Sequence, residues 1–106
     1  MDIVEKIRNL QLHDVALDMV AFNWASSSIT IKYLAYQDDT NDYYTKSIEF
    51  TQTSEVIFNC NSIFSIREIT SVAVNMVADG YHAKIIFLTD LGGPSYELIF
   101  NFKTLE

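Results

Sequence analysis

The sequence predicts an α+β domain: a short N-terminal helix followed by a curved antiparallel meander sheet of six or seven strands, strongly curved or closed into an open barrel. Three observations support this prediction. Apolar residues recur at helical spacing near the N-terminus, they alternate with polar residues from Val15 onward, and glycine-containing turns interrupt the alternation. A chain of 106 residues that is 49% hydrophobic is expected to form a single domain, residues 1–106.

The first expected element is a helix from Asp2 to Gln11. Asp2 can cap the free backbone N–H groups, and Glu5 places a negative charge in the first turn, where the helix dipole favours it. An apolar stripe is formed by Ile3, Val4, Ile7 and Leu10. Because so short a helix is unstable alone in water, this stripe is expected to pack on the sheet.

The next segment, Val15 to Trp24, is predicted to be a strand whose inner face is ambiguous. Two alternating sets of residues are both apolar, namely Val15, Leu17 and Met19, and Val20, Phe22 and Trp24. We favour Val20 and Phe22 as the inward residues.

In the first half of the chain, the clearest strand register is that of a hairpin with a loop from Asp38 to Asn41. One face is then formed by the pairs Ala35 with Tyr44, Tyr33 with Lys46, Ile31 with Ile48 and Ile29 with Phe50. The other face holds Thr30 with Glu49, Lys32 with Ser47 and Tyr36 with Tyr43. Apolar and charge patterns agree on this register, since Lys32 is diagonal to Glu49.

The second half is predicted to form two further hairpins. A turn at Asp79-Gly80 pairs Met76 with Ala83, Val74 with Ile85 and Val72 with Phe87. A turn at Gly92-Gly93 makes Leu98 face Phe87 and Phe100 face Ile85. One apolar surface results, made of Val72, Val74, Ile85, Phe87, Leu98 and Phe100. The opposite surface carries Ile86 and Ile99, which we expect the helix to cover in part. Residues 51–68 fit an irregular strand or a short helix.

Composition excludes several classes of protein. Fourteen acids against seven bases give a net charge of −7, which argues against nucleic acid or an anionic membrane as the partner. No apolar run is long enough to span a bilayer, and Met1 to Leu12 lacks the apolar core of a signal peptide, so a cytoplasmic location is expected. A single cysteine can form neither an internal disulfide nor a zinc site. No cofactor and no metal are expected.

Catalytic groups are sparse, and we expect no enzyme activity. The two histidines, His13 and His82, are interpreted as a junction residue and a surface residue, and Cys60 as a small buried hydrophobe. The acidic segment from Asp38 to Asp42 resembles a calcium loop in composition, but it lacks the glycine and the glutamate that an EF-hand requires. An enzyme would need a histidine in a cleft beside a carboxylate or Cys60.

Charge placement points to a protein-binding surface. Five acids and one base between Asp38 and Glu55 give this segment a charge of −4. Tyrosine among carboxylates suits an interface with a basic protein. The expected partner-binding residues are Asp38, Asp39, Asp42, Tyr36, Tyr43, Glu49 and Glu55. The alternative is an acidic hairpin that only discourages edge-to-edge pairing.

A resemblance adds to this interpretation. Leu12-His13-Asp14, then Leu17, Val20 and Phe22, then an alternating strand from Ile29, are similar to the opening of small uncharacterised bacterial β-rich domains, some of which are grouped with immunity proteins of polymorphic toxin systems. The resemblance covers about the first 50 residues. It implies a cytoplasmic protein that binds a cognate toxin and blocks it without catalysis.

Two other hypotheses stay open. The first is a small-molecule carrier whose curved sheet encloses a pocket lined by Phe22, Phe50, Phe87 and Phe100. The second is a homodimer that hides the face carrying Ile86 and Ile99.

Overall fold

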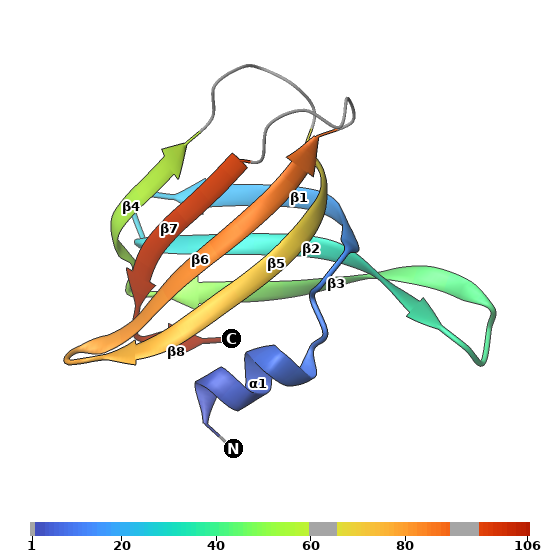
Figure 1. Ribbon diagram of the computed structural model, residues 1–106, viewed down its shortest axis with the longest axis horizontal. Coiled ribbons are helices and arrows are strands. Elements are labelled where there is room, and N and C mark those ends of the chain that lie inside the picture. Colours follow the sequence, from blue (N-terminus) through green and yellow to red (C-terminus); the bar gives the residue numbers. More distant parts are fainter. Residues whose placement is uncertain (1, 60–65, 90–95) are drawn as a thin grey trace.

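The computed structural model describes residues 2–59, 66–89 and 96–106, which form one helix and eight strands (Figure 1). In chain order the elements are α1 (Ile3–Asn9), β1 (Val15–Asn23), β2 (Ser28–Gln37), β3 (Asp42–Thr51), β4 (Ser54–Asn59), β5 (Ile66–Val77), β6 (Gly80–Thr89), β7 (Tyr96–Phe102) and β8 (Thr104–Leu105). The predicted α+β class, with a short N-terminal helix and a curved antiparallel sheet, is confirmed.

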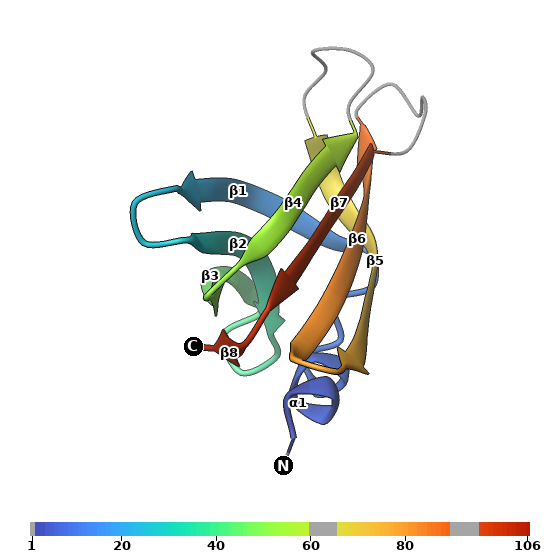
Figure 2. The ribbon, with the colours of Figure 1, turned by 90° about the vertical axis from the view of Figure 1, so that its left-hand side faces the viewer.

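The strands form one antiparallel sheet in the order β4-β7-β6-β5-β1-β2-β3-β8, and the sheet is not closed into a barrel. Two meanders make up most of it, β1-β2-β3 and β5-β6-β7. The strand β4 follows β3 in sequence but pairs with β7 at one edge, while β8 continues from β7 and pairs with β3 at the other edge. The sheet curls, so the strands of the two meanders cross one another (Figure 2).

The helix α1 begins as the sequence predicts. Asp2 is the N-cap, and its Oδ1 accepts a hydrogen bond from the backbone N–H of Glu5 at 2.8 Å. The helix ends earlier than expected, at Asn9, and Gln11 has a positive φ of 53°. The expectation that the helix covers the outer surface is wrong. Ile7 is buried in the same core cluster as the inner residue Ile85, so α1 lies on the inner side of the sheet.

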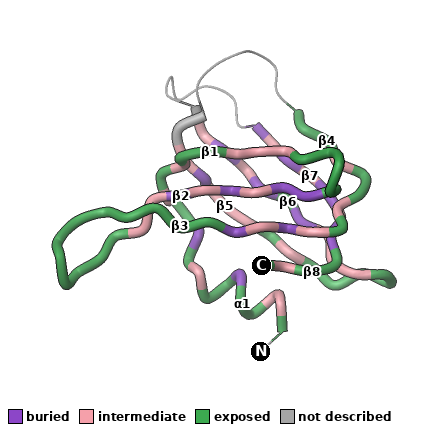
Figure 3. The backbone as a smooth tube through the Cα atoms, turned by 180° about the vertical axis from the view of Figure 1, so that it is seen from behind, coloured by how far each residue is buried: buried purple, intermediate pink, exposed green. Residues whose placement is uncertain are grey.

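The core lies on the concave side of the curled sheet, and along the core strands buried residues alternate mostly with half-buried ones (Figure 3). It consists of Ile7, Leu12, Ile29, Ile31, Tyr33, Ile48, Phe50, Ile69, Ala83, Ile85, Phe87, Tyr96, Leu98, Phe100 and Phe102, each at most 5% exposed. Phe50 is at its centre, with its ring packed edge-on against those of Phe100 and Phe102 at 5.0 and 4.9 Å between centroids. Aromatic pairs in this geometry add stability beyond the area they bury.

The ambiguity of β1 is resolved by a β-bulge. Leu17 pairs with Tyr33, but Met19 pairs with Lys32, so the register shifts by one residue at Asp18. A bulge places two residues opposite one and reverses the alternation beyond it. Leu17 from one apolar set and Val20 from the other therefore both pack against the core, and the preference for Val20 and Phe22 as inward residues is confirmed.

The register of the β2–β3 hairpin is confirmed throughout. All predicted pairs are present, from Ile29 with Phe50 to Tyr36 with Tyr43, and residues 38–41 form the loop. The apolar pairs are buried where the hairpin crosses the core, and every residue from 36 to 47 is exposed.

The β5–β6 turn is placed wrongly in the prediction, although the faces are right. The turn residues are Ala78 and Asp79, and Val77 pairs with Gly80. Gly80, not Asp79, carries the positive φ, of 122°. Ala83 and Ile85 therefore each pair two positions away from the expected partner, as in Val74 with Ala83, and Phe87, which lies beyond a register shift between Ile69 and Ser71, pairs with Ile69 instead of Val72. A shift of two preserves the side-chain alternation.

The β6–β7 register differs from the prediction in the same way. Ile85 pairs with Leu98, and Ala83 with Phe100, again a shift of two positions. The predicted apolar surface is still confirmed, because Ile85 and Leu98 are fully buried and Val72 packs against the core. Met76 is an exception: it lies beyond the core and is 69% exposed. The expected turn at Gly92-Gly93 lies outside the described residues.

Residues 51–68, for which the sequence fits an irregular strand or a short helix, contain the edge strand β4 and the start of β5. In β4 the ring of Phe58 points inward, with its centroid 6.2 Å from that of Phe87, while Ile57 pairs with Ile99 and is 52% exposed. Ile86 and Ile99 are half-buried. Residues 60–65, including Cys60, lie outside the described residues.

Candidate functional site

The tip of the β2–β3 hairpin carries the acidic cluster predicted from the sequence. Asp38 and Asp39 are in the loop and Asp42 is the first residue of β3, and all three are exposed. The hairpin extends well past the rest of the sheet (Figure 1), so the tip is accessible from several directions. The structure therefore brings these three carboxylates together on one projection.

Local contacts order this tip. The rings of Tyr36 and Tyr43 pack edge to face, with their centroids 5.3 Å apart. The hydroxyl of Tyr36 donates a hydrogen bond to Oδ1 of Asn41, and Oδ1 of Asp42 accepts one from the backbone N–H of Tyr43 at 2.8 Å. Because the side chains are held by these contacts, less conformational entropy would be lost when a partner binds.

The other two predicted binding residues lie elsewhere. Glu49 is half-buried on β3, where its backbone N–H donates to the carbonyl of Glu106 at 2.9 Å. Glu55 lies on β4, and its Oε2 accepts a hydrogen bond from Nδ2 of Asn101 at 2.9 Å. Glu49 and Glu55 are thus close to the tip acids in sequence but do not join them in space.

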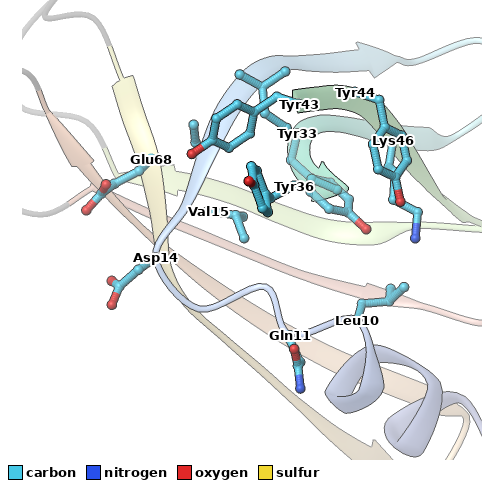
Figure 4. A pocket seen from close by; sticks show the side chains of 13 residues that line it. Leu10, Gln11, Asp14, Val15, Tyr33, Tyr36, Tyr43, Tyr44, Lys46 and Glu68 are labelled. Carbon is cyan, nitrogen blue, oxygen red and sulfur yellow. The ribbon is translucent and has the colours of Figure 1, made fainter. Parts of the chain in front are cut away.

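A cleft beside the hairpin, which reaches as far as Tyr36 and Tyr43, was not identified from the sequence. The N-terminal end of β1 leaves β2 and pairs with β5 instead, through Val15 with Ile69 and Ala16 with Glu68. A pocket of about 610 Å³ opens between the separating strands and the end of α1 (Figure 4). Its lining includes Leu10, Gln11, Asp14, Val15, Tyr33, Tyr36, Tyr43, Tyr44, Lys46 and Glu68.

The cleft has a distinct distribution of charge. Figure 4 shows Asp14 and Glu68 on one side and Lys46 on the opposite side, with the ring of Tyr36 between them. The ammonium of Lys46 lies 6.0 Å from the ring centroid of Tyr44. Four tyrosines in a short segment were visible in the sequence, but the carboxylates arrive from β5 and from the turn before β1. Asp14 and Glu68 reach the cleft because β1 leaves β2 and pairs with β5.

Tyr33 forms the buried wall of this cleft. The residue is 2% exposed, and burial raises the pKa of its phenol above the ordinary value of 10.0, with a smaller contribution from Tyr44. Desolvation disfavours the phenolate, so Tyr33 is neutral at physiological pH.

The histidines are held by polar neighbours. Nε2 of His13 lies 3.2 Å from Oδ2 of Asp14, and both side chains are exposed. Nδ1 of the half-buried His82 is 2.8 Å from Oδ1 of Asn101, and Nδ2 of Asn101 donates a hydrogen bond to Oε2 of Glu55. Within the described residues, no group of three or more metal-binding side chains is found. No helix in that part of the chain is long and apolar enough to cross a membrane.

No family model, curated protein or solved structure matches the chain.

Proposed function

We propose that this chain is a non-enzymatic protein-binding domain whose β2–β3 hairpin docks on a basic protein surface. The observation that carries the proposal is the exposed projection that holds Asp38, Asp39 and Asp42 together with the ordered pair Tyr36 and Tyr43. Tyrosine rings supply contact area at an interface, and grouped carboxylates accelerate encounter with a cationic partner. Within this proposal, Glu49 and Glu55 contribute to the long-range field and not to the contact.

The partner class we propose is a toxin, and the domain would act as its cytoplasmic immunity protein. The resemblance in the first half of the chain motivates this choice. A single acidic domain that occupies the cationic substrate site of a nuclease would block the enzyme without any chemistry of its own.

The packing of the interior favours this proposal over a small-molecule carrier. A carrier needs a cavity lined by Phe22, Phe50, Phe87 and Phe100, but three of these side chains, Phe50, Phe87 and Phe100, are at most 1% exposed. The fourth, Phe22, is half-buried, and its ring packs against those of Trp24 and Phe58. The ring of Phe50 touches its aromatic neighbours directly. Three of the four side chains proposed as pocket lining thus belong to the packed core.

The test compares two variants of equal net charge. The tip variant combines Asp38→Lys, Asp39→Lys and Asp42→Lys, and the control variant reverses three exposed acids elsewhere, Asp18, Asp79 and Glu106. Affinity capture with the wild-type chain identifies the partner, and the dissociation constant is then measured for all three proteins. The proposal predicts at least tenfold weaker binding for the tip variant and a much smaller change for the control. Equal losses in both variants would contradict a local contact at the tip.

A further inference from the structure

We infer that the cleft beside β2 receives an extended basic segment of the partner, which adds a strand to the open edge of β2. The inference rests on the proposed function and specifies which kind of partner segment binds in the cleft. The β1–β2 ladder stops at Leu17 with Tyr33, and in the ladders of the described residues Leu34–Gln37 pair only with β3.

The backbone of β2 provides the first argument. Residues of an antiparallel strand direct their N–H and C=O groups alternately to the two sides. Within Leu34–Gln37, every second residue therefore presents these groups away from β3, toward the side from which β1 has turned away. An open edge of this kind is a template on which an extended segment can pair.

The side chains around the cleft determine the charge of that segment. Asp14 and Glu68 line one side of the pocket, and Tyr36 and Tyr43 provide aromatic surface beside them (Figure 4). A guanidinium can pair with a carboxylate and stack on a tyrosine ring at the same time. The contact of Lys46 with Tyr44 is an internal example of a cation placed over a tyrosine ring in the same cleft.

Charge also argues against a second copy of this chain as the occupant. Pairing of two β2 edges would bring two acidic hairpins together, each belonging to a chain with a net charge of −7. Like charges at close range destabilise such a pair. A basic segment avoids this repulsion and is instead attracted to the acidic hairpin.

The test uses a synthetic probe. An acetylated and amidated seven-residue peptide that alternates valine with arginine is titrated into the isotope-labelled full chain and followed by NMR. Saturable shifts are expected at the backbone amides of Val15, Tyr36 and Glu68. A peptide with citrulline in place of arginine should bind about fivefold more weakly. A peptide methylated on alternate backbone nitrogens should lose binding, because it lacks the donors that strand pairing needs.

A matched pair of variants tests whether the carboxylate of Glu68 in the cleft attracts the arginine peptide. Glu68→Gln should weaken the arginine peptide about threefold, and Asp79→Asn, which removes one charge at the distant β5–β6 turn, should leave its binding unchanged. Equal binding of the citrulline or methylated peptide, or shifts confined to residues 38–42, would overturn the inference. If the peptide fails while the tip variant still weakens the captured partner, only this inference is wrong; if neither effect is seen, the proposed function is wrong too.

Discussion

Leu17 and Val20 point to the same side of the sheet although three positions separate them in a strand. The bulge at Asp18 produces this arrangement, since Leu17 faces Tyr33 while Val20 faces Ile31. Both side chains pack against the core, and Met19 between them is 40% exposed.

The first prediction follows from this bulge. Leu17→Ala and Val20→Ala should each lower the free energy of unfolding by about 1–2 kcal/mol, because each removes half-buried apolar surface. Met19→Ala should change it by less than about 0.5 kcal/mol. Urea denaturation measures all three. A strand of regular alternation would instead make one of the first two substitutions neutral.

A second prediction concerns Gly80. A Cβ atom at this position would lie 2.7 Å from the carbonyl oxygen of Phe102, and the positive φ of 122° is strained for any other residue. Gly80→Ala should therefore cost about 2–3 kcal/mol of unfolding free energy. The neighbouring change Asp79→Ala, at an exposed turn position, is the control and should shift the thermal midpoint little. A stable Gly80→Ala variant would mean that this hairpin packs differently against β7.

The aromatic centre of the core yields the third prediction. Phe50→Ala should destabilise the domain by about 3–5 kcal/mol, since it removes a fully buried ring that contacts Phe100 and Phe102. Met76→Ala, at a side chain 69% exposed, should be nearly neutral by the same thermal or urea measurement. Similar effects for the two variants would refute the assignment of Phe50 to the core.

The pH dependence of stability should report on Tyr33. Burial raises its pKa in the folded state above the value of about 10 expected in the unfolded chain. Its contribution to stability is then fully present below pH ~10 and is lost as the pH rises through the folded-state pKa. The wild type should lose stability relative to Tyr33→Phe above pH ~10 in urea titrations. Parallel profiles up to pH ~11.5 would show that the phenol is not desolvated.

Most of the strand pattern could be predicted from the sequence, and the differences have identifiable causes. The β2–β3 register is right because two independent patterns agree on it. The β5–β6 register is wrong by two positions because Asp79-Gly80 has the composition of a favoured turn, whereas the chain turns at Ala78 and Asp79. Side-chain alternation has a period of two, so the residues assigned to the core face are still correct after a shift of two positions.

The site was only partly predictable. Asp38, Asp39 and Asp42 are close together in sequence, and a local hairpin keeps them together in space. Glu55 could not be separated from them by sequence, because β4 crosses to the edge beside β7. The cleft depends on the point at which β1 exchanges β2 for β5, and a change of ladder partner leaves no signal in hydrophobic periodicity.

The association rate constant with the captured partner, measured as a function of ionic strength, tests the central claim most directly. Binding through the hairpin tip predicts a rate for the wild type that falls steeply as salt rises, and a slow, nearly salt-independent rate for the tip variant. The control variant of the same net charge should stay close to the wild type. Equal rates for the tip and control variants at every salt concentration would contradict the claim that the tip of the hairpin meets the partner.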